Sequence, residues 1–214
     1  TTMCYTCSGF FIKSFFCLPR WPFLPVNLIN KTYFNQNLGI ELKDLDGKKI
    51  DLSGSWEPSV KHSFITNRKE DSLSYAIEIF PGNYLKKSFV FNPENYSIKV
   101  SIMAQEIKNN VHRDMFLLWG GGLSTTEKDI KDDKTYFNSY IYQGGELEEL
   151  KSSFGEMEKK SFNGATAWSA IRTKYFVSAL IPDLENNIRS ASLSGLGDTL
   201  ETHKMSFTVD PHNK

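Results

Sequence analysis

The chain has no uninterrupted apolar run long enough to cross a membrane as a helix, which takes about 18 to 20 residues. The nearest approach is the aromatic patch from Phe10 to Leu28, which is interrupted by Arg20 and by three prolines (Pro19, Pro22 and Pro25). This patch also lacks the layout of a secretory signal peptide. We therefore expect any export signal to lie outside these 214 residues.

The sequence has no excess of charge of either sign. It holds 25 Lys and Arg against 25 Asp and Glu, so its formal net charge is zero. A nucleic-acid-binding protein needs a basic surface to neutralise phosphates, and this balance argues against that class. It also gives no general electrostatic attraction to anionic lipid.

Cysteine and histidine are scarce. Cys4 and Cys7 form a Cys-x-x-Cys pair and Cys17 is left over, while the nearest histidine is His62. A structural zinc site needs four ligands, so this set does not predict one. The four histidines are widely spaced, with no pair four residues apart. We expect no metal and no cofactor.

The motifs of common enzyme classes are also missing. His112-Arg113-Asp114 imitates the catalytic loop of protein kinases, but Trp119 stands where that loop needs an Asn. The three glycines after Trp119 lack the Lys-Ser/Thr of a phosphate-binding loop, so they indicate a tight turn or a close backbone approach. There is no Gly-x-Ser-x-Gly elbow. We predict no catalytic residue and a protein that is not an enzyme.

What the sequence does contain is period-two alternation. Aromatic residues make up 14% of the chain, and aromatic and β-branched residues favour strands. Apolar residues alternate with polar ones in residues 72–79, 85–91 and 96–102, and the turns between these segments hold Pro-Gly-Asn and Asn-Pro-Glu-Asn. Three consecutive alternating segments predict a sheet with one buried face.

Other segments extend this pattern. Ile40 to Leu52 predicts a hairpin around Asp46-Gly47. Further strands are predicted at residues 8–15, 115–119, 136–142, 184–194 and 205–209. Two charged stretches interrupt them. A helical turn is predicted to start near Ser124 and Glu127, followed by a surface loop at 128–134, and residues 146–160 are predicted to be solvated with at most one short helix.

The longest apolar segment of the C-terminal half runs from Trp168 to Pro182. Trp168, Ile171, Tyr175 and Ala179 fit one face of a helix, yet alternate residues from Tyr175 onward fit a strand equally well. Periodicity alone cannot decide between the two.

Four segments in order make the chain resemble the large extracytoplasmic domain of bacterial YidC-type membrane protein insertases. They are Ser8-Gly9-Phe10-Phe11-Ile12-Lys13-Ser14-Phe15, then residues 87–98 with their aromatic strand, polar turn and Tyr-led strand, then Trp119–Leu123 with Thr126-Glu127, and finally Trp168 to Pro182. The stretch Cys17-Leu18-Pro19-Arg20-Trp21-Pro22 departs from the family's pattern.

The resemblance implies an all-β, mainly antiparallel fold. The family fold is a twisted two-sheet β-supersandwich, like that of galactose mutarotase, with a few short helical turns. We expect residues 1–214 to form one such periplasmic domain. In the family this domain lies outside the inner membrane and is tethered to it by helices beyond this chain, which carry out the insertion. Implied partners are the Sec translocon, its accessory subunits and, through the full-length protein, nascent membrane proteins.

The resemblance also implies that Trp168 to Pro182 is strand. Trp168, Tyr175 and Phe176 are then predicted to be core residues that hold one sheet against the other, or residues that contact a partner. The expected role is a non-catalytic scaffold or docking module for inserting and folding inner-membrane proteins.

The alternative is a carbohydrate-active β-sandwich protein, either an aldose epimerase or a carbohydrate-binding module. An epimerase needs a histidine acid facing a glutamate base, for which His112 with a glutamate is the candidate. A binding module would carry exposed aromatic residues on a concave face.

Overall fold

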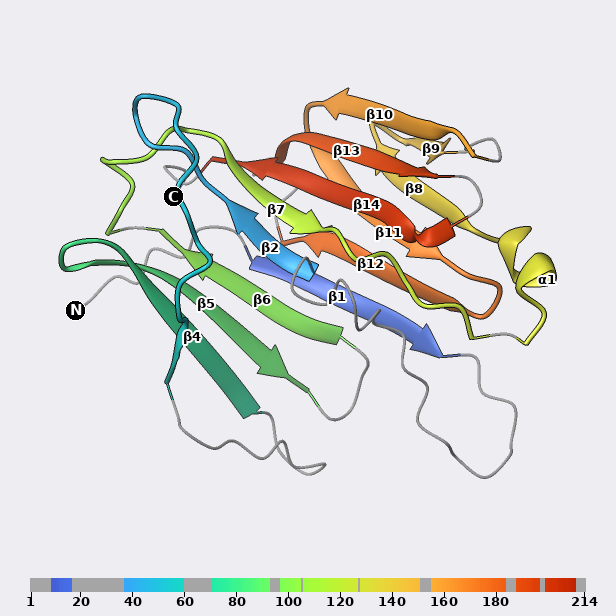
Figure 1. Ribbon diagram of the computed structural model, residues 1–214, viewed down its shortest axis with the longest axis horizontal. Helices are drawn as coiled ribbons and strands as arrows, with labels where there is room; N and C mark the ends of the chain where they lie inside the picture. The colour runs from blue at the N-terminus through green and yellow to red at the C-terminus, as the bar shows by residue number, and fades with distance from the viewer. Residues whose placement is uncertain are drawn as a thin grey trace.

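The computed structural model, drawn in Figure 1, consists almost entirely of antiparallel β-strands in two sheets. It describes residues 9–16, 37–59, 71–92, 97–104, 106–126, 128–150, 155–183, 188–196 and 199–210. The three cysteines, His62 and Glu127 lie outside this part of the chain.

The larger sheet has nine strands and the smaller has five. In spatial order the larger sheet is β3 (Glu57–Pro58), β4 (Asp71–Phe80), β5 (Asn83–Phe91), β6 (Ser97–Met103), β1 (Gly9–Phe16), β12 (Phe176–Pro182), β11 (Thr166–Arg172), β8 (Asn138–Gln143) and β9 (Glu146–Leu150). The smaller is β10 (Met157–Asn163), β13 (Ile188–Leu196), β14 (Thr199–Val209), β7 (Met115–Trp119) and β2 (Asn37–Glu41). One helix, α1 (Ile130–Lys134), is present in the described residues.

Alternating side chains explain why these segments are strands. In β7, Met115, Leu117 and Trp119 are buried while the residues between them are half-buried. In β13, Ala191 and Leu193 face the core and the serines between them face outward. A strand with one apolar face must bury it against a second layer. The predicted antiparallel β-rich protein with little helix is therefore confirmed.

The core lies between the two sheets, where β11 and β8 contact β13 and β14. Ile141, Ile171 and Leu180 of the larger sheet belong to the same buried cluster as Leu193 and Phe207 of the smaller one. In Figure 1 the smaller sheet accordingly lies over one half of the larger sheet.

β1 is an internal strand of the larger sheet although it comes first in the chain. It pairs with β6 on one side and with β12 on the other, both antiparallel. Figure 1 shows it in blue between β6 and β12. The strand predicted at residues 8–15 is thus confirmed from Gly9 onward, and it joins two four-stranded halves of the sheet.

The hairpin around Asp46-Gly47 and the strands of residues 72–102 are also confirmed. The hairpin closes through a hydrogen bond from the Asp44 amide to the Lys48 carbonyl, and Gly47 supplies the positive φ of 83° that the turn requires. β4, β5 and β6 pair in sequence order, as the period-two pattern predicted.

Two predictions about charged segments are wrong. Residues 146–160 contain the strands β9 and β10 rather than a solvated stretch with one helix. Both are edge strands, and an edge strand tolerates alternating Glu and Lys because one side faces water. Residues 128–134, predicted as a surface loop, contain α1. This helix begins after Asp129 rather than near Ser124.

Trp168 to Pro182 forms most of a β-hairpin. β11 and β12 are antiparallel neighbours, with Ser169 opposite Leu180 and Arg172 opposite Val177. The strand prediction is confirmed for both halves, and residues 173–175 form the turn between them.

Candidate functional site

The three residues singled out in the sequence lie on this hairpin but in different surroundings. Trp168 is half-buried on β11, and its ring stacks on that of Tyr142 at 5.7 Å between centroids. The neighbouring residues Ser169 and Ile171 are buried against the smaller sheet. Because successive side chains of a strand point to opposite faces, Trp168 lies on the face turned away from the smaller sheet.

Phe176 and Tyr175 differ in burial. Phe176 opens β12, is half-buried, and shares a face with the buried residues Ser178 and Leu180. Tyr175 lies in the turn and is 45% exposed. The predicted core position is therefore wrong for Tyr175, because the chain reverses direction at that residue. A role of Phe176 in holding the sheets together stays a prediction. Trp168 faces away from the smaller sheet, so of its two predicted roles only contact with a partner stays a prediction.

Thr173 shapes the turn. It is almost fully buried, and its Oγ1 accepts hydrogen bonds from the amides of Tyr175 at 3.3 Å and Phe176 at 3.0 Å. Its own amide donates to the Phe176 carbonyl at 2.8 Å. A threonine hydroxyl that satisfies two turn amides can replace the glycine or proline usual in such turns.

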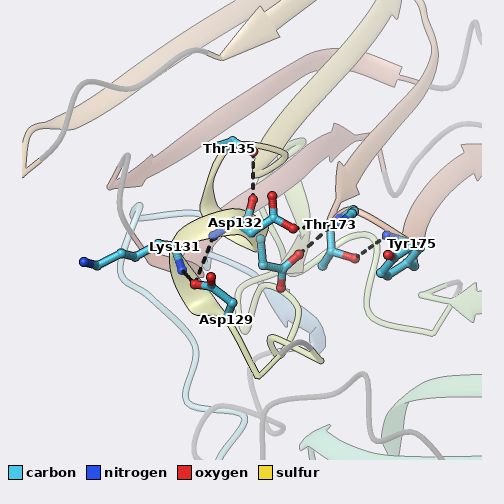
Figure 2. Close-up of polar contacts among 8 residues, drawn as sticks. Asp129, Lys131, Asp132, Thr135, Thr173 and Tyr175 are labelled. Carbon is cyan, nitrogen blue, oxygen red and sulfur yellow. Dashed lines mark hydrogen bonds and ion pairs between the residues drawn. The ribbon is translucent and has the colours of Figure 1, made fainter.

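The turn rests against α1, and Figure 2 shows this turn–helix junction, which we define as α1 with residues 173–175. Asp129 caps the helix by accepting from the amides of Lys131 at 3.0 Å and Asp132 at 3.4 Å. Lys174 spans the two elements. Its Nζ donates to Asp132 Oδ2 at 2.6 Å, and its amide donates to Asp133 Oδ1 at 3.3 Å.

The surroundings of Lys174 in the junction keep its ammonium group protonated. The hydrogen bond that Lys174 donates to Asp132, followed by the one to Tyr175, raises the pKa of Lys174 above its ordinary value. Its ammonium also lies 5.1 Å from the Tyr175 ring centroid and 5.6 Å from that of Tyr136. A lysine that stays charged cannot act as a base near neutral pH. The junction therefore fastens the turn and presents Tyr175 at the surface.

Asp133 is the buried member of the junction. Its side chain is fully buried, and its Oδ2 has no hydrogen-bond partner among the described residues. No group of three or more His, Cys, Asp or Glu side chains in the described part of the chain is arranged to hold a metal ion.

The histidine proposed for an epimerase lies on the surface. His112 Nδ1 is 3.7 Å from Asp114 Oδ2, and Asp114 in turn bonds Arg189 at 2.9 Å. Among the described residues, the carboxylate beside His112 is this aspartate and not a glutamate across a cleft.

The glycines after Trp119 have the predicted backbone role. Gly122 has φ 57°, and its carbonyl accepts from Trp119 Nε1 at 2.9 Å.

Two further titratable side chains, the buried His203 and the half-buried Lys87, were not singled out in the sequence. His203 Nδ1 lies 2.7 Å from Ser139 Oγ, and its Nε2 lies 3.0 Å from the Leu196 carbonyl, so it links β14 to β8. Lys87 Nζ donates to the Leu38 carbonyl at 2.7 Å and lies 4.9 Å from the Trp56 ring centroid. Desolvation lowers the pKa of both groups, that of Lys87 to about 8. The period-two alternation of the strands could have identified them. His203 lies two residues before the buried Met205 and Lys87 lies two residues after the buried Leu85, so each points to the same face of its strand as that core residue.

In the described part of the chain no helix is long and apolar enough to cross a membrane. Comparisons with known proteins agree on one family. The model of the YidC periplasmic domain matches residues 25–214.

The relatives are membrane protein insertases of the YidC type. The protein of Prosthecochloris aestuarii is 31% identical over 146 residues, which is 65% of this chain and 25% of that protein. The protein of Chlorobaculum parvum is 28% identical over 145 residues, with the same coverage. That of Porphyromonas gingivalis strain ATCC 33277 is 25% identical over 179 residues, which is 80% of this chain and 27% of that protein. The chain thus spans about a quarter of the length of these curated relatives. No solved structure matches it.

Proposed function

Because the chain belongs to the YidC periplasmic domain family, we propose that it is the non-catalytic docking module of a membrane protein insertase. The family places the domain on the periplasmic side of the inner membrane. The match over residues 25–214 carries this proposal, since it covers most of the described strands. The proposed partners are the Sec translocon with its accessory subunits and, through the full-length protein, nascent membrane proteins.

The proposed architecture is a single twisted β-supersandwich domain over residues 1–214, of the galactose-mutarotase type. Two antiparallel sheets that face each other across one core support it. An experimental structure would test the proposal through the strand order and the angle between the two sheets.

The proposed docking face is a row of side chains across four strands of the larger sheet. Trp168 of β11 lies opposite Tyr142 of β8, and Tyr142 lies opposite Leu147 of β9. On the other side of Trp168, the register places Ile181 of β12 beside it. Leu147 is 57% exposed, and the other three are half-buried. Aromatic anchors beside aliphatic side chains are typical of the central part of protein–protein interfaces.

A charge placed in this row tests the proposal. Leu147→Glu in the full-length insertase should reduce the amount of translocon subunits that co-purify from detergent-solubilised membranes, because a carboxylate would have to be desolvated at the interface. Leu45→Glu is the matched control, since Leu45 is 66% exposed on the 42–50 hairpin. Equal recovery of partners with both variants would contradict the assignment of the face.

One observation favours the carbohydrate-binding alternative. The rings of Trp168 and Tyr142 are stacked on each other with 12° between their planes, and both side chains are half-buried, so the pair offers exposed aromatic surface to a sugar ring. Retention of the domain on immobilised glycans that is lost in Tyr142→Ala would support this function. The epimerase alternative predicts faster mutarotation of aldoses than in buffer, and an unchanged rate would remove it.

A further inference from the structure

The outer face of the smaller sheet carries a pocket of about 730 Å³. Its floor is made by residues of β10, β13, β14, β7 and β2, and the segment Lys49–Ser53 forms a wall. The pocket is on the opposite side of the molecule from the proposed docking face, because the two sheets pack against each other between them.

Strand register brings two lysines and three serines together on the floor. Lys159 of β10 lies opposite Ser194 of β13, and Ser194 lies opposite Lys204 of β14. In the next outward row, Ser192 lies opposite Ser206, and their hydroxyl oxygens are 2.7 Å apart. With strands about 4.8 Å apart, the two lysine backbones are about 10 Å apart with Ser194 between them.

The two lysines are available to a ligand. Both are exposed, and neither forms an ion pair with a carboxylate of the described residues. The third lysine of the pocket, Lys49, is paired with Glu41 at 2.6 Å. Asp51 accepts from the Ser53 amide at 2.9 Å, and this bond lowers its pKa.

The hydroxyl pair adds a donor. The hydrogen bond between Ser192 and Ser206 uses one of their two hydroxyl protons, which leaves the other to donate into the pocket. Ser194 supplies a further hydroxyl. Ammonium groups and hydroxyls converging from neighbouring strands suit an anion with several acceptor oxygens. Ile50, Leu52 and Leu118 line the remainder of the pocket with apolar surface, which gives room for an organic group attached to that anion.

We propose that this pocket binds a phosphate group, held by Lys159 and Lys204 with the hydroxyls of Ser192, Ser194 and Ser206. The phosphate could come from solution or from the phosphodiester of an anionic lipid headgroup, and the experiment separates these sources.

The test is a titration of the 214-residue chain followed by amide chemical shifts. Inorganic phosphate is added at constant ionic strength, with chloride as the balancing anion. A parallel arm measures flotation with phosphatidylglycerol vesicles against phosphatidylcholine vesicles. The variants are Lys159→Met/Lys204→Met and the single change Lys204→Gln, with Lys131→Met on α1 as the control for loss of a lysine elsewhere. Thermal melting checks that each variant is folded.

Saturable shifts around Ser194 and Lys204 with phosphate are expected, and the double variant should bind at least roughly a hundredfold more weakly, because it loses two charge-assisted hydrogen bonds. Binding to phosphatidylglycerol vesicles alone, lost in the double variant, would support the site with lipid as the source. No saturable shift together with no preference for phosphatidylglycerol would overturn the proposal. Equal loss of binding in Lys131→Met would overturn it too, because binding would then depend on overall charge.

Discussion

At the scale of single residues, His203 is an ionisable side chain that is almost fully buried, so its protonation should affect stability. A carbonyl only accepts, so Nε2 donates to Leu196, and in the neutral ring Nδ1 accepts from Ser139. Burial lowers the pKa of His203 below its ordinary value of about 6.5. The unfolded chain therefore takes up the proton first as the pH falls, and the contribution of His203 to stability, present above about pH 6.5, is lost below it.

The free energy of unfolding should accordingly be lower at about pH 5 than at about pH 7.5 in urea titrations. Part of this dependence should vanish in His203→Gln. His112→Gln is the control, because His112 is exposed and bonds a surface aspartate. Identical pH profiles for the wild type and His203→Gln would show that the buried ring does not titrate in this range.

The ring of His203 packs so closely against Gly195 that it leaves no space for a side chain at position 195. A Cβ added at Gly195 would lie 2.7 Å from His203 Cδ2, which is closer than van der Waals contact allows. Gly195→Ala should lower the free energy of unfolding by about 1–3 kcal/mol, measured by urea denaturation. The control is Gly54→Ala, whose Cβ would meet Ile77 at an ordinary 3.5 Å. Equal stability of the two variants would mean that the histidine ring moves aside without cost.

At the scale of elements, the period of the apolar residues decided what could be predicted. β4, β5 and β6 were predictable because one face of each strand is apolar and Pro or Gly marks their turns. β10 was not, because its residues are mostly charged or polar and its partner strand supplies the hydrogen bonds that make it a strand. A strand that forms because of its pairing with a distant strand cannot be predicted from the periodicity of its own residues.

The candidate site was predicted only in part for a related reason. Trp168 and Phe176 lie on strands as expected, but the turn between those strands contains neither glycine nor proline. Its shape comes from the Thr173 hydroxyl and from the contact of Lys174 with α1, which is 42 residues away in sequence. Tyr175 was therefore placed in a strand interior when it lies at a tip.

The burial of Phe176 gives a prediction for β12. Phe176→Ala should cost about 2 kcal/mol in the free energy of unfolding, since the side chain is half-buried. Phe207→Ala is the comparison. Phe207 is fully buried in β14, and its replacement should cost about 3–5 kcal/mol. Urea denaturation measures both values, and a larger loss for Phe176 than for Phe207 would place Phe176 at the centre of the core.

At the scale of the whole molecule, β1 joins two halves of the larger sheet. Lys13 lies opposite Ala179 of β12 and Ser97 of β6, so its backbone is in the middle of the ladder. Lys13→Pro should broaden or split the thermal unfolding transition, because proline removes an amide donor and distorts a central strand. Lys13→Thr should unfold in one step like the wild type. A single sharp transition for Lys13→Pro would mean that the halves cooperate without β1.

The two faces of the molecule have different proposed uses. The larger sheet offers the row from Ile181 to Leu147 to a protein partner, and the smaller sheet offers a lysine and serine pocket to a phosphate group. The common core between them fixes both surfaces, so a change on one face should leave the other unaffected.

The most direct test of the docking role is photocrosslinking in intact membranes. A photoreactive amino acid at Leu147 of the full-length insertase should crosslink to subunits of the translocon, and the same residue at Leu45 should not. Crosslinks from Leu45 but not from Leu147, or none to any translocon subunit from either position, would contradict the proposal that this face of the periplasmic domain docks the translocon.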